Sequence, residues 1–351
     1  MGISENNARE GCTLPLVCIC IPTYNAAVTV HETLQSILHQ TYLNLVVHIS
    51  DNASTDETLQ IIEEIKDSRI TVHRNLENVG GEANFNRCIQ LAEGKYTAIF
   101  HADDVYEPDM VERQVAVLEA HSEAGAVFTD ASLIDERGNR IGEIRLPKGI
   151  TSQNGLYDFS TMFKAVLRHS NFFICPSVMV RTKVYKQEIK CWRGELFKSS
   201  ADLDLWLRIL RQHPIGYLPE RLMRYRISDH QWSARVRLGT ERADFFLVID
   251  HYLAQEQVRA LLDATDLNNY RWLDRRDRVM RATNLFITGF PKQANELAHD
   301  IFSRDALTAV YKSKRGAMVF ILGVFVKLLV VMNLNSLGRA SLAYMKHVAR
   351  K

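Results

Sequence analysis

The chain has 351 residues, of which 46% are hydrophobic and 24% are charged. This composition is ordinary for a folded protein, and the length exceeds what one compact core accommodates. We therefore expect one large domain with a helical extension. The formal net charge of +2 gives no sign of a nucleic-acid partner, and none is expected.

The cysteines and the N-terminus indicate a reducing compartment. The six cysteines, at positions 12, 18, 20, 88, 175 and 191, include no Cys-x-x-Cys pair. Cys18 and Cys20 lie two apart on an expected strand, which favours packing of small apolar side chains over metal binding. Residues 1–13 form a polar tail without the apolar core of a secretory signal. We expect reduced thiols and a cytoplasmic location.

The first third of the chain alternates between short apolar runs and segments with a helical period. The apolar runs predict strands over 16–21, 45–49, 70–73 and 96–100, each followed by a helix. Pro108 begins the last of these helices, a common place for proline. This alternation predicts an α/β fold with a mostly parallel, Rossmann-like sheet flanked by helices.

The same domain continues to about residue 235, so that it spans 14–235. Strands are expected over 126–128 and 176–180, a hairpin over 132–142, and helices over 157–168, near 183 and over 201–212. Residues 215–218 and 222–225 suggest two edge strands.

Residues 236–351 have long helical patterns and form the expected helical C-terminal region. The apolar segment 317–332 contains Lys327 and is shorter than the roughly 20 residues that span a bilayer. Basic residues lie on both sides of this segment. A helix on an anionic membrane surface and a buried terminal helix both fit. We favour peripheral membrane contact through residues 316–351.

Three polar loops follow the expected strands at their carboxyl ends, where α/β sheets bind ligands. They are Pro22 to Asn25, Asp51 to Asp56, and His101 to Asp104. The paired carboxylates Asp103 and Asp104 suit a hard divalent cation that bridges to a phosphate-bearing substrate. Capping of the next helix is the alternative role for this pair.

The ordered set of motifs resembles the inverting glycosyltransferases of family 2. The motifs are Pro22-Thr-Tyr-Asn25, Asp51-Asn-Ala-Ser-Thr-Asp56, Asn78-Val-Gly80, Ala102-Asp-Asp104 and Ser200-Ala-Asp-Leu-Asp-Leu-Trp-Leu-Arg208. The resemblance covers roughly residues 14 to 233. It implies an A-type glycosyltransferase fold, a nucleotide-diphosphate sugar as donor, and Mg²⁺ or Mn²⁺ as cofactor.

The resemblance also implies roles for single residues. The nucleotide-sugar site would comprise Pro22, Thr23, Tyr24, Asn25, Asp51, Asn86, Asp103 and Asp104. Asp51 would accept a hydrogen bond from the imide N–H of uracil. Asp103, Asp104 and His230 would hold the metal, although His101 stands where the family usually has an aspartate.

Some of these assignments have structural alternatives. Asn86 could be a packing amide, Asp56 a helix cap, and His230 an ordinary satisfied histidine. Arg226 could pair with a phosphate or with Glu220.

Asp202 takes the position of the family's catalytic base, while Ala201 replaces the usual glutamate. Inversion by single displacement needs a carboxylate within hydrogen-bond reach of the acceptor hydroxyl. A helix-capping role, worth about 1 kcal/mol of stability, is the alternative for Asp202. We expect structural roles for Asp204, Trp206 and Arg208.

We therefore expect an inverting glycosyltransferase in cell-surface polysaccharide synthesis. It would move a sugar from a UDP-linked donor to a hydroxyl of a glycan or lipid-linked acceptor, at the inner face of the plasma membrane. A non-catalytic nucleotide-sugar-binding or scaffold subunit is the alternative, motivated by His101 and Ala201. The first loop lacks the glycine-rich basic sequence of nucleotidyltransferases, and no GxGxxG indicates a dinucleotide-binding oxidoreductase.

Overall fold

The computed structural model describes residues 14–342 apart from 154, 229–238, 313, 335 and 337. The strands are β1 (Val17–Thr23), β2 (Leu45–Asp51), β3 (Ile70–Arg74), β4 (Tyr96–Ile99), β5 (Val105–Tyr106), β6 (Ala126–Ile134), β7 (Arg140–Ile144), β8 (Leu156–Tyr157), β9 (Met179–Arg181) and β10 (Ile215–Arg226). Within the described residues they form one sheet in the order β3-β2-β1-β4-β9-β6-β10-β5, with β7 paired to β6 and β8 to β10.

The first four strands of the chain are parallel to one another, as expected. The helices that connect and follow them are α1 (Val30–Leu38), α2 (Thr58–Glu64), α3 (Gly81–Leu91) and α4 (Met110–Ala120). Beyond β4 the sheet becomes mixed, because β9 runs antiparallel between β4 and β6. The α/β class with a helix-flanked sheet is confirmed.

The expectation of two edge strands near the end of this domain is wrong. Residues 215–226 form the single strand β10, which lies between β6 and β5 and also pairs with β8. Its pairing with β6 shifts register after Leu218 and again after Arg221. Pro219 lies at the first shift, and proline cannot donate to the ladder there. The strand therefore continues through this irregularity. From the sequence alone, the same position was interpreted as a break between two strands.

The core occupies both faces of the sheet. Along β1 the side chains alternate, so that Val17, Ile19 and Ile21 join one buried cluster while Cys18 and Cys20 join the other. Both cysteines are buried and free. Their expected role as small apolar core residues is confirmed.

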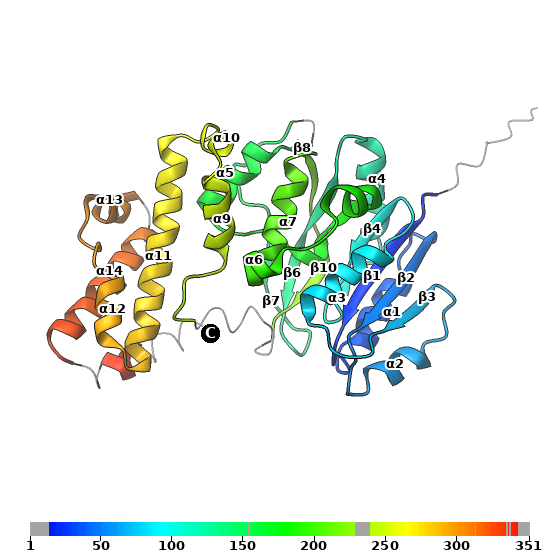
Figure 1. Ribbon diagram of the computed structural model, residues 1–351, viewed down its shortest axis with the longest axis horizontal. Helices are drawn as coiled ribbons and strands as arrows, with labels where there is room; N and C mark the ends of the chain where they lie inside the picture. The colour runs from blue at the N-terminus through cyan, green and yellow to red at the C-terminus, as the bar shows by residue number, and fades with distance from the viewer. Residues whose placement is uncertain are drawn as a thin grey trace, which may run out of the picture.

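Helices dominate the rest of the chain. They are α5 (Phe159–His169), α6 (Gly194–Phe197), α7 (Ala201–Leu210), α9 (Phe245–Leu253), α10 (Glu256–Arg259), α11 (Ala264–Thr288), α12 (Pro291–Leu297), α13 (Arg304–Lys312) and α14 (Lys314–Val331), with 3₁₀ turns at Cys175–Ser177 and Lys198–Ser200 and a π-helix at Val184–Ile189. Figure 1 shows α11 to α14 at the end of the molecule opposite β1, β2 and β3. The helical C-terminal region is confirmed.

The position of the domain boundary stays a prediction. Val248, Ile249 and Tyr252 of α9 belong to the same buried cluster as Leu203 and Trp206 of α7. The helices after residue 235 therefore begin by packing on the first domain.

Helix α14 has one buried and one open face. Val326 and Leu329 pack with Phe286 of α11 and Ala294 of α12 in a separate small core. Met318, Ile321, Leu328 and Val331 are instead between 51% and 78% exposed. No helix among the described residues combines the length and the apolar character needed to cross a bilayer. The buried-helix alternative thus accounts for one face of α14 and leaves the other without a partner in the described chain.

Candidate active site

The loop after β1 brings the first predicted pocket residues to the carboxyl edge of the sheet. Thr23 ends β1, is buried, and pairs with Asp51 at the end of β2. The next residue, Tyr24, is 48% exposed. Asn25 has a left-handed backbone with φ 48°, and its side-chain oxygen accepts a hydrogen bond from Thr55 N at 2.8 Å. This hydrogen bond joins the loops after β1 and β2 into one wall.

Asp51 presents a buried carboxylate oxygen that lacks a donor. Its Oδ2 accepts a hydrogen bond from Ser54 N at 3.1 Å, whereas its Oδ1 has no partner in the described structure. A buried acceptor without a donor is costly. The imide N–H of a pyrimidine base would supply the missing donor.

The loop after β4 gathers three groups that can ligate a metal. One nitrogen of His101 and one carboxylate oxygen each of Asp103 and Asp104 all lie within 4.8 Å of one another. Burial raises the pKa of Asp104 well above its usual value, and the Asp103 charge adds to this effect. Burial also lowers the pKa of His101. His101 Nε2 and Asp104 Oδ2 are buried without a hydrogen-bond partner in the described chain. This set of one nitrogen and two oxygen ligands fits a divalent cation.

Arg226, the last residue of β10, holds this acidic loop in place. Its backbone N–H donates to Asp104 Oδ1 at 2.8 Å, and its Nε donates to Asp103 O at 2.8 Å. Its Nη2 donates to Glu32 Oε2 at 2.6 Å. Glu220, the protein partner considered from the sequence, instead binds Arg113 at 2.6 Å. Arg226 therefore ties β10 to the acidic loop and to α1.

Asp202 lies in the first turn of α7 with its carboxylate partly buried. Its Oδ1 accepts a hydrogen bond from Leu203 N at 2.7 Å. Burial raises the pKa of Asp202 to about 6, and this hydrogen bond and the nearby Asn171 side chain oppose the effect. The N-cap residue of α7 is Ser200, so the simple capping role does not describe Asp202. A carboxylate with this pKa suits a general base near neutral pH.

Asp204, two residues later, is a structural residue, as expected. It is fully buried, and its Oδ2 accepts hydrogen bonds from Arg193 Nε at 2.9 Å and Arg208 Nε at 3.0 Å. Trp206 is buried in the core. The two aspartates of this motif therefore have different environments.

The acidic loop and Asp202 share one neighbourhood. Burial and then the charges of Asp104, Asp103, Cys175 and Asp202 raise the pKa of Tyr225 on β10, so all three carboxylates lie within electrostatic range of its hydroxyl. Burial, followed by the charges of Asp202 and Asp104, raises the pKa of Cys175 in the same way.

Asp51 is related to this neighbourhood through the strand register. Thr23 at the end of β1 pairs with Asp51, and Phe100 N donates to Cys20 O of β1 at 2.9 Å. The carboxyl ends of β1, β2 and β4 therefore meet at one edge, although Asp51 shares no direct contact with Asp202.

The other predicted residues are engaged within the protein or lie outside the described chain. The Asn86 side-chain oxygen accepts a hydrogen bond from Trp192 N at 2.7 Å, as the packing alternative requires. Asp56 accepts hydrogen bonds from Thr58 N and Ala27 N, each at 3.1 Å, in line with a cap. His230 lies outside the described residues, and its role stays a prediction.

Sequence reasoning missed four residues around the site. From the sequence, His101 was recognised as a departure from the motif but not as a possible metal ligand. Its position at the end of a strand could have indicated that role. Asn171, Cys175 and Tyr225 lie in the loop after α5, in a 3₁₀ turn and in β10. No motif marks them, because only the folded chain brings these elements to Asp202.

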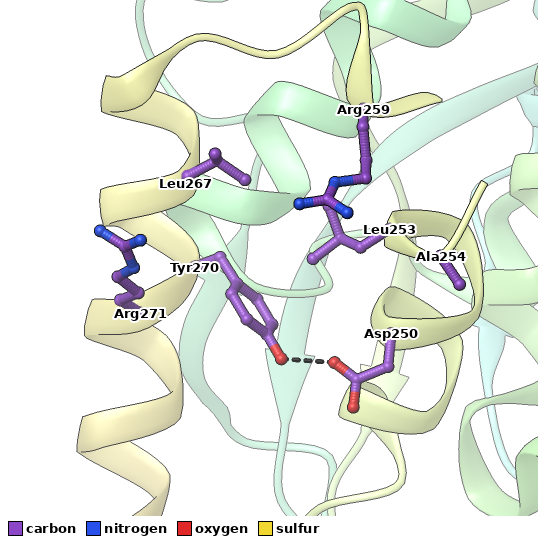
Figure 2. A pocket seen from close by; sticks show the side chains of 7 residues that line it. All are labelled: Asp250, Leu253, Ala254, Arg259, Leu267, Tyr270 and Arg271. Atoms are coloured by element: carbon purple, nitrogen blue, oxygen red, sulfur yellow. Dashed lines mark hydrogen bonds between the residues drawn. The ribbon is translucent and has the colours of Figure 1, made fainter. Parts of the chain in front are cut away.

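A cavity lies in the helical region, away from these strand ends. It has a volume of about 340 Å³ and is lined by Asp250, Leu253, Ala254, Arg259, Leu267, Tyr270 and Arg271. Figure 2 shows Tyr270 of α11 donating a hydrogen bond to Asp250 of α9 across this cavity. The carboxylates described above do not line it, so it is separate from the candidate site.

Comparison with known proteins identifies the family. The family model for Glycosyl transferase family 2 matches residues 18–188. The uncharacterized glycosyltransferase MJ1057 of Methanocaldococcus jannaschii is 31% identical over 220 residues, which are 61% of this chain and 72% of the relative. The chain belongs to glycosyltransferase family 2. It is a glycosyltransferase, as its sequence motifs predicted.

Two further comparisons concern a relative of known reaction and a solved structure. The Escherichia coli UDP-Glc:alpha-D-GlcNAc-diphosphoundecaprenol beta-1,3-glucosyltransferase WfaP is 37% identical over 106 residues, covering 30% of this chain and 42% of the relative. The crystal structure of Staphylococcus aureus TarS residues 1–349 with UDP-GlcNAc aligns over 91% of this chain and 92% of that chain, with a TM-score of 0.58 and 17% identity. This likeness shows the shared fold and confirms the A-type glycosyltransferase fold.

The pKa of Asp202 predicts an acid limb in the pH–rate profile of this glycosyltransferase. A general base works only when deprotonated, so kcat/KM should fall about tenfold per pH unit below about pH 6. Initial rates of nucleotide release between about pH 5 and about pH 8 measure this limb. A profile that stays flat from pH 7 to pH 5 would contradict the assignment of Asp202.

The same pKa also predicts the effect of Asp202 on stability. Its folded-state pKa of about 6 lies above the ordinary value of 3.8. The native state therefore binds more protons, and this carboxyl makes the protein less stable as the pH rises through that interval. The Asp202→Asn variant should have a Tm at pH 7 no lower than that of the wild type.

Proposed function

We propose that this glycosyltransferase transfers a sugar from a UDP-linked donor to a hydroxyl of a glycan or lipid-linked acceptor, with inversion at the anomeric carbon. The observation that carries the proposal is the His101–Asp103–Asp104 cluster after β4, with the Asp202 carboxylate and this cluster both within electrostatic range of Tyr225. A base and a diphosphate-binding acidic loop on one crevice are what a single displacement requires.

In this mechanism Asp202 accepts the proton of the acceptor hydroxyl. The acceptor oxygen forms a bond to the anomeric carbon while the bond from that carbon to the diphosphate oxygen breaks. The nucleoside diphosphate leaves with the electron pair, and the configuration inverts. The hydrogen bond from Leu203 N would hold the carboxylate of Asp202 during the proton transfer.

The donor would be held at both ends. Asp51 Oδ1 would accept the uracil N–H, and the exposed ring of Tyr24 would lie against the base. Asp103 and Asp104, together with His230, would hold Mg²⁺ or Mn²⁺ at the diphosphate. When bound, this cation neutralises charge on the leaving group.

The relative WfaP supports a lipid-linked acceptor, and helix α14 supports a location at the membrane. The name of WfaP gives an undecaprenyl-diphosphate acceptor, which is a membrane lipid, and we propose an acceptor of this kind in cell-surface polysaccharide synthesis. The apolar open face of α14 begins beside the exposed Lys314. An apolar face with basic neighbours suits peripheral binding to an anionic membrane, here at the cytoplasmic side of the plasma membrane.

A panel of nucleotide sugars tests the donor assignment. We expect UDP-sugars to release UDP in the presence of Mg²⁺ or Mn²⁺, with loss of activity on chelation. The Asp51→Ala variant should bind the UDP-sugar about 10-fold more weakly or worse, since a hydrogen bond to a charged group contributes about 1.5–3 kcal/mol. The exposed neighbour Glu57→Ala, in the same loop, is the matched control and should bind normally. Binding without turnover of any donor would instead support the non-catalytic subunit.

Vesicle sedimentation tests the membrane proposal. The variant Ile321→Glu/Leu328→Glu should lose binding to phosphatidylglycerol vesicles by about 10-fold or more, because burial of each apolar side chain contributes about 1.5–3 kcal/mol. Leu43→Glu, a 75% exposed position in the first domain, should bind as the wild type does. Equal sedimentation of the double variant and this control would refute membrane contact through α14.

A further inference from the structure

His101 places an imidazole at the first position of the motif His101-Ala-Asp-Asp104. We propose that His101 supplies a nitrogen ligand to the cation held by Asp103 and Asp104, so that this site selects first-row transition ions such as Mn²⁺ and Co²⁺ over Mg²⁺. The inference rests on the proposed function, in which this cation accompanies the donor diphosphate.

The spacing of the side chains fits a shared ion. His101 Nδ1 lies 3.8 Å from Asp104 Oδ2. This separation exceeds a hydrogen bond, which spans about 2.7–3.2 Å. Two ligands that each lie about 2.1 Å from one ion are at most about 4.2 Å apart. The pair is therefore too distant for a direct hydrogen bond and close enough for a common cation.

The position of His101 is held by its neighbours. The Tyr106 hydroxyl accepts a hydrogen bond from His101 N at 2.7 Å and donates to His101 O at 3.3 Å. The Tyr106 ring is itself stacked on Phe100 in the core. Phe85 contacts the imidazole ring edge-on at 5.6 Å between centroids. The backbone of His101 is thus fixed beside the carboxylates, and Phe85 packs against its imidazole ring.

The carboxylate facing this imidazole has an open ligand position. Asp104 is fully buried, and its Oδ1 is occupied by Arg226 N. Its Oδ2, together with His101 Nε2, has no hydrogen-bond partner in the described structure. A buried oxygen without a donor is costly, and an ion between Asp104 and His101 would remove this cost. Helix capping by Asp103 and Asp104 does not explain the open Oδ2 of Asp104.

The identity of the ligand atoms determines which ion is preferred. Mg²⁺ takes oxygen ligands and keeps several waters. Imidazole nitrogen favours later first-row ions, whose affinity for mixed nitrogen and oxygen sites rises along the series from Mn²⁺. A His-Asp-Asp set should therefore discriminate against Mg²⁺ more strongly than three carboxylates would.

The test uses the full-length protein with UDP and Mn²⁺ as the probe. Pulsed electron paramagnetic resonance of bound Mn²⁺ detects a directly coordinated imidazole through its ¹⁴N coupling. Because His230 is also proposed at this cation, we expect ¹⁴N coupling from two imidazoles in the wild type and loss of the His101 contribution in His101→Asp. Competition with Mg²⁺ should show that His101→Asp lowers the ratio of Mn²⁺ to Mg²⁺ affinity by at least about 10-fold.

His230→Ala is the matched control, because His230 is the other histidine proposed at this metal. It should keep the ¹⁴N coupling that His101 contributes, which His101→Asp loses. Absence of the coupling in the wild type, its loss only in His230→Ala, or failure of the wild type to bind Mn²⁺ would each overturn the inference. These wild-type results do not require the His101 variant to fold. Metal-dependent donor turnover without ¹⁴N coupling would refute this inference alone, whereas coupling without turnover would refute the proposed function alone.

Discussion

Burial of the Asp104 carboxylate is the constraint on which the site depends. Its backbone oxygen accepts a hydrogen bond from Thr33 of α1 at 2.8 Å, and its Oδ1 accepts one from Arg226 of β10 at 2.8 Å. These two contacts fix the loop after β4 between elements that are far apart in the sequence. They leave Asp103 at the carboxyl edge of the sheet and Oδ2 of Asp104 without a hydrogen-bond donor. Because a buried charge needs a counter-charge, this arrangement favours a cation at the same point.

Much of the fold could be predicted from the sequence, because its signals are local. The apolar runs that form β1, β2 and β4 are buried on both faces, which makes them continuous and easy to recognise. Asp51 ends β2, and Asp103 and Asp104 follow β4, so the position of these acidic residues at the carboxyl edge of the sheet was predictable as well. The irregular strand β10 was not, because Pro219 interrupts the pattern of a strand that pairing with β6 nevertheless maintains.

The rest of the site depends on contacts between distant segments. Asn171 reaches Asp202 from the end of α5, after Ser170 with a left-handed φ of 69°, and neither residue belongs to a recognisable motif. The difference between Asp202 and Asp204 likewise arises from tertiary structure, since only Asp204 lies between two arginines. Two identical side chains in one helical turn thus have different environments, and the proposed chemistry belongs to Asp202 alone.

The most direct test compares these two aspartates in the same assay. Asp202→Asn should keep donor affinity and fold while transfer falls by about 10²–10⁴-fold, the contribution typical of a general base. Asp204→Asn should instead unfold more easily, because a buried ion pair that loses one partner costs about 3–5 kcal/mol. Turnover in Asp202→Asn within about threefold of the wild type would contradict the central claim that Asp202 removes the acceptor proton.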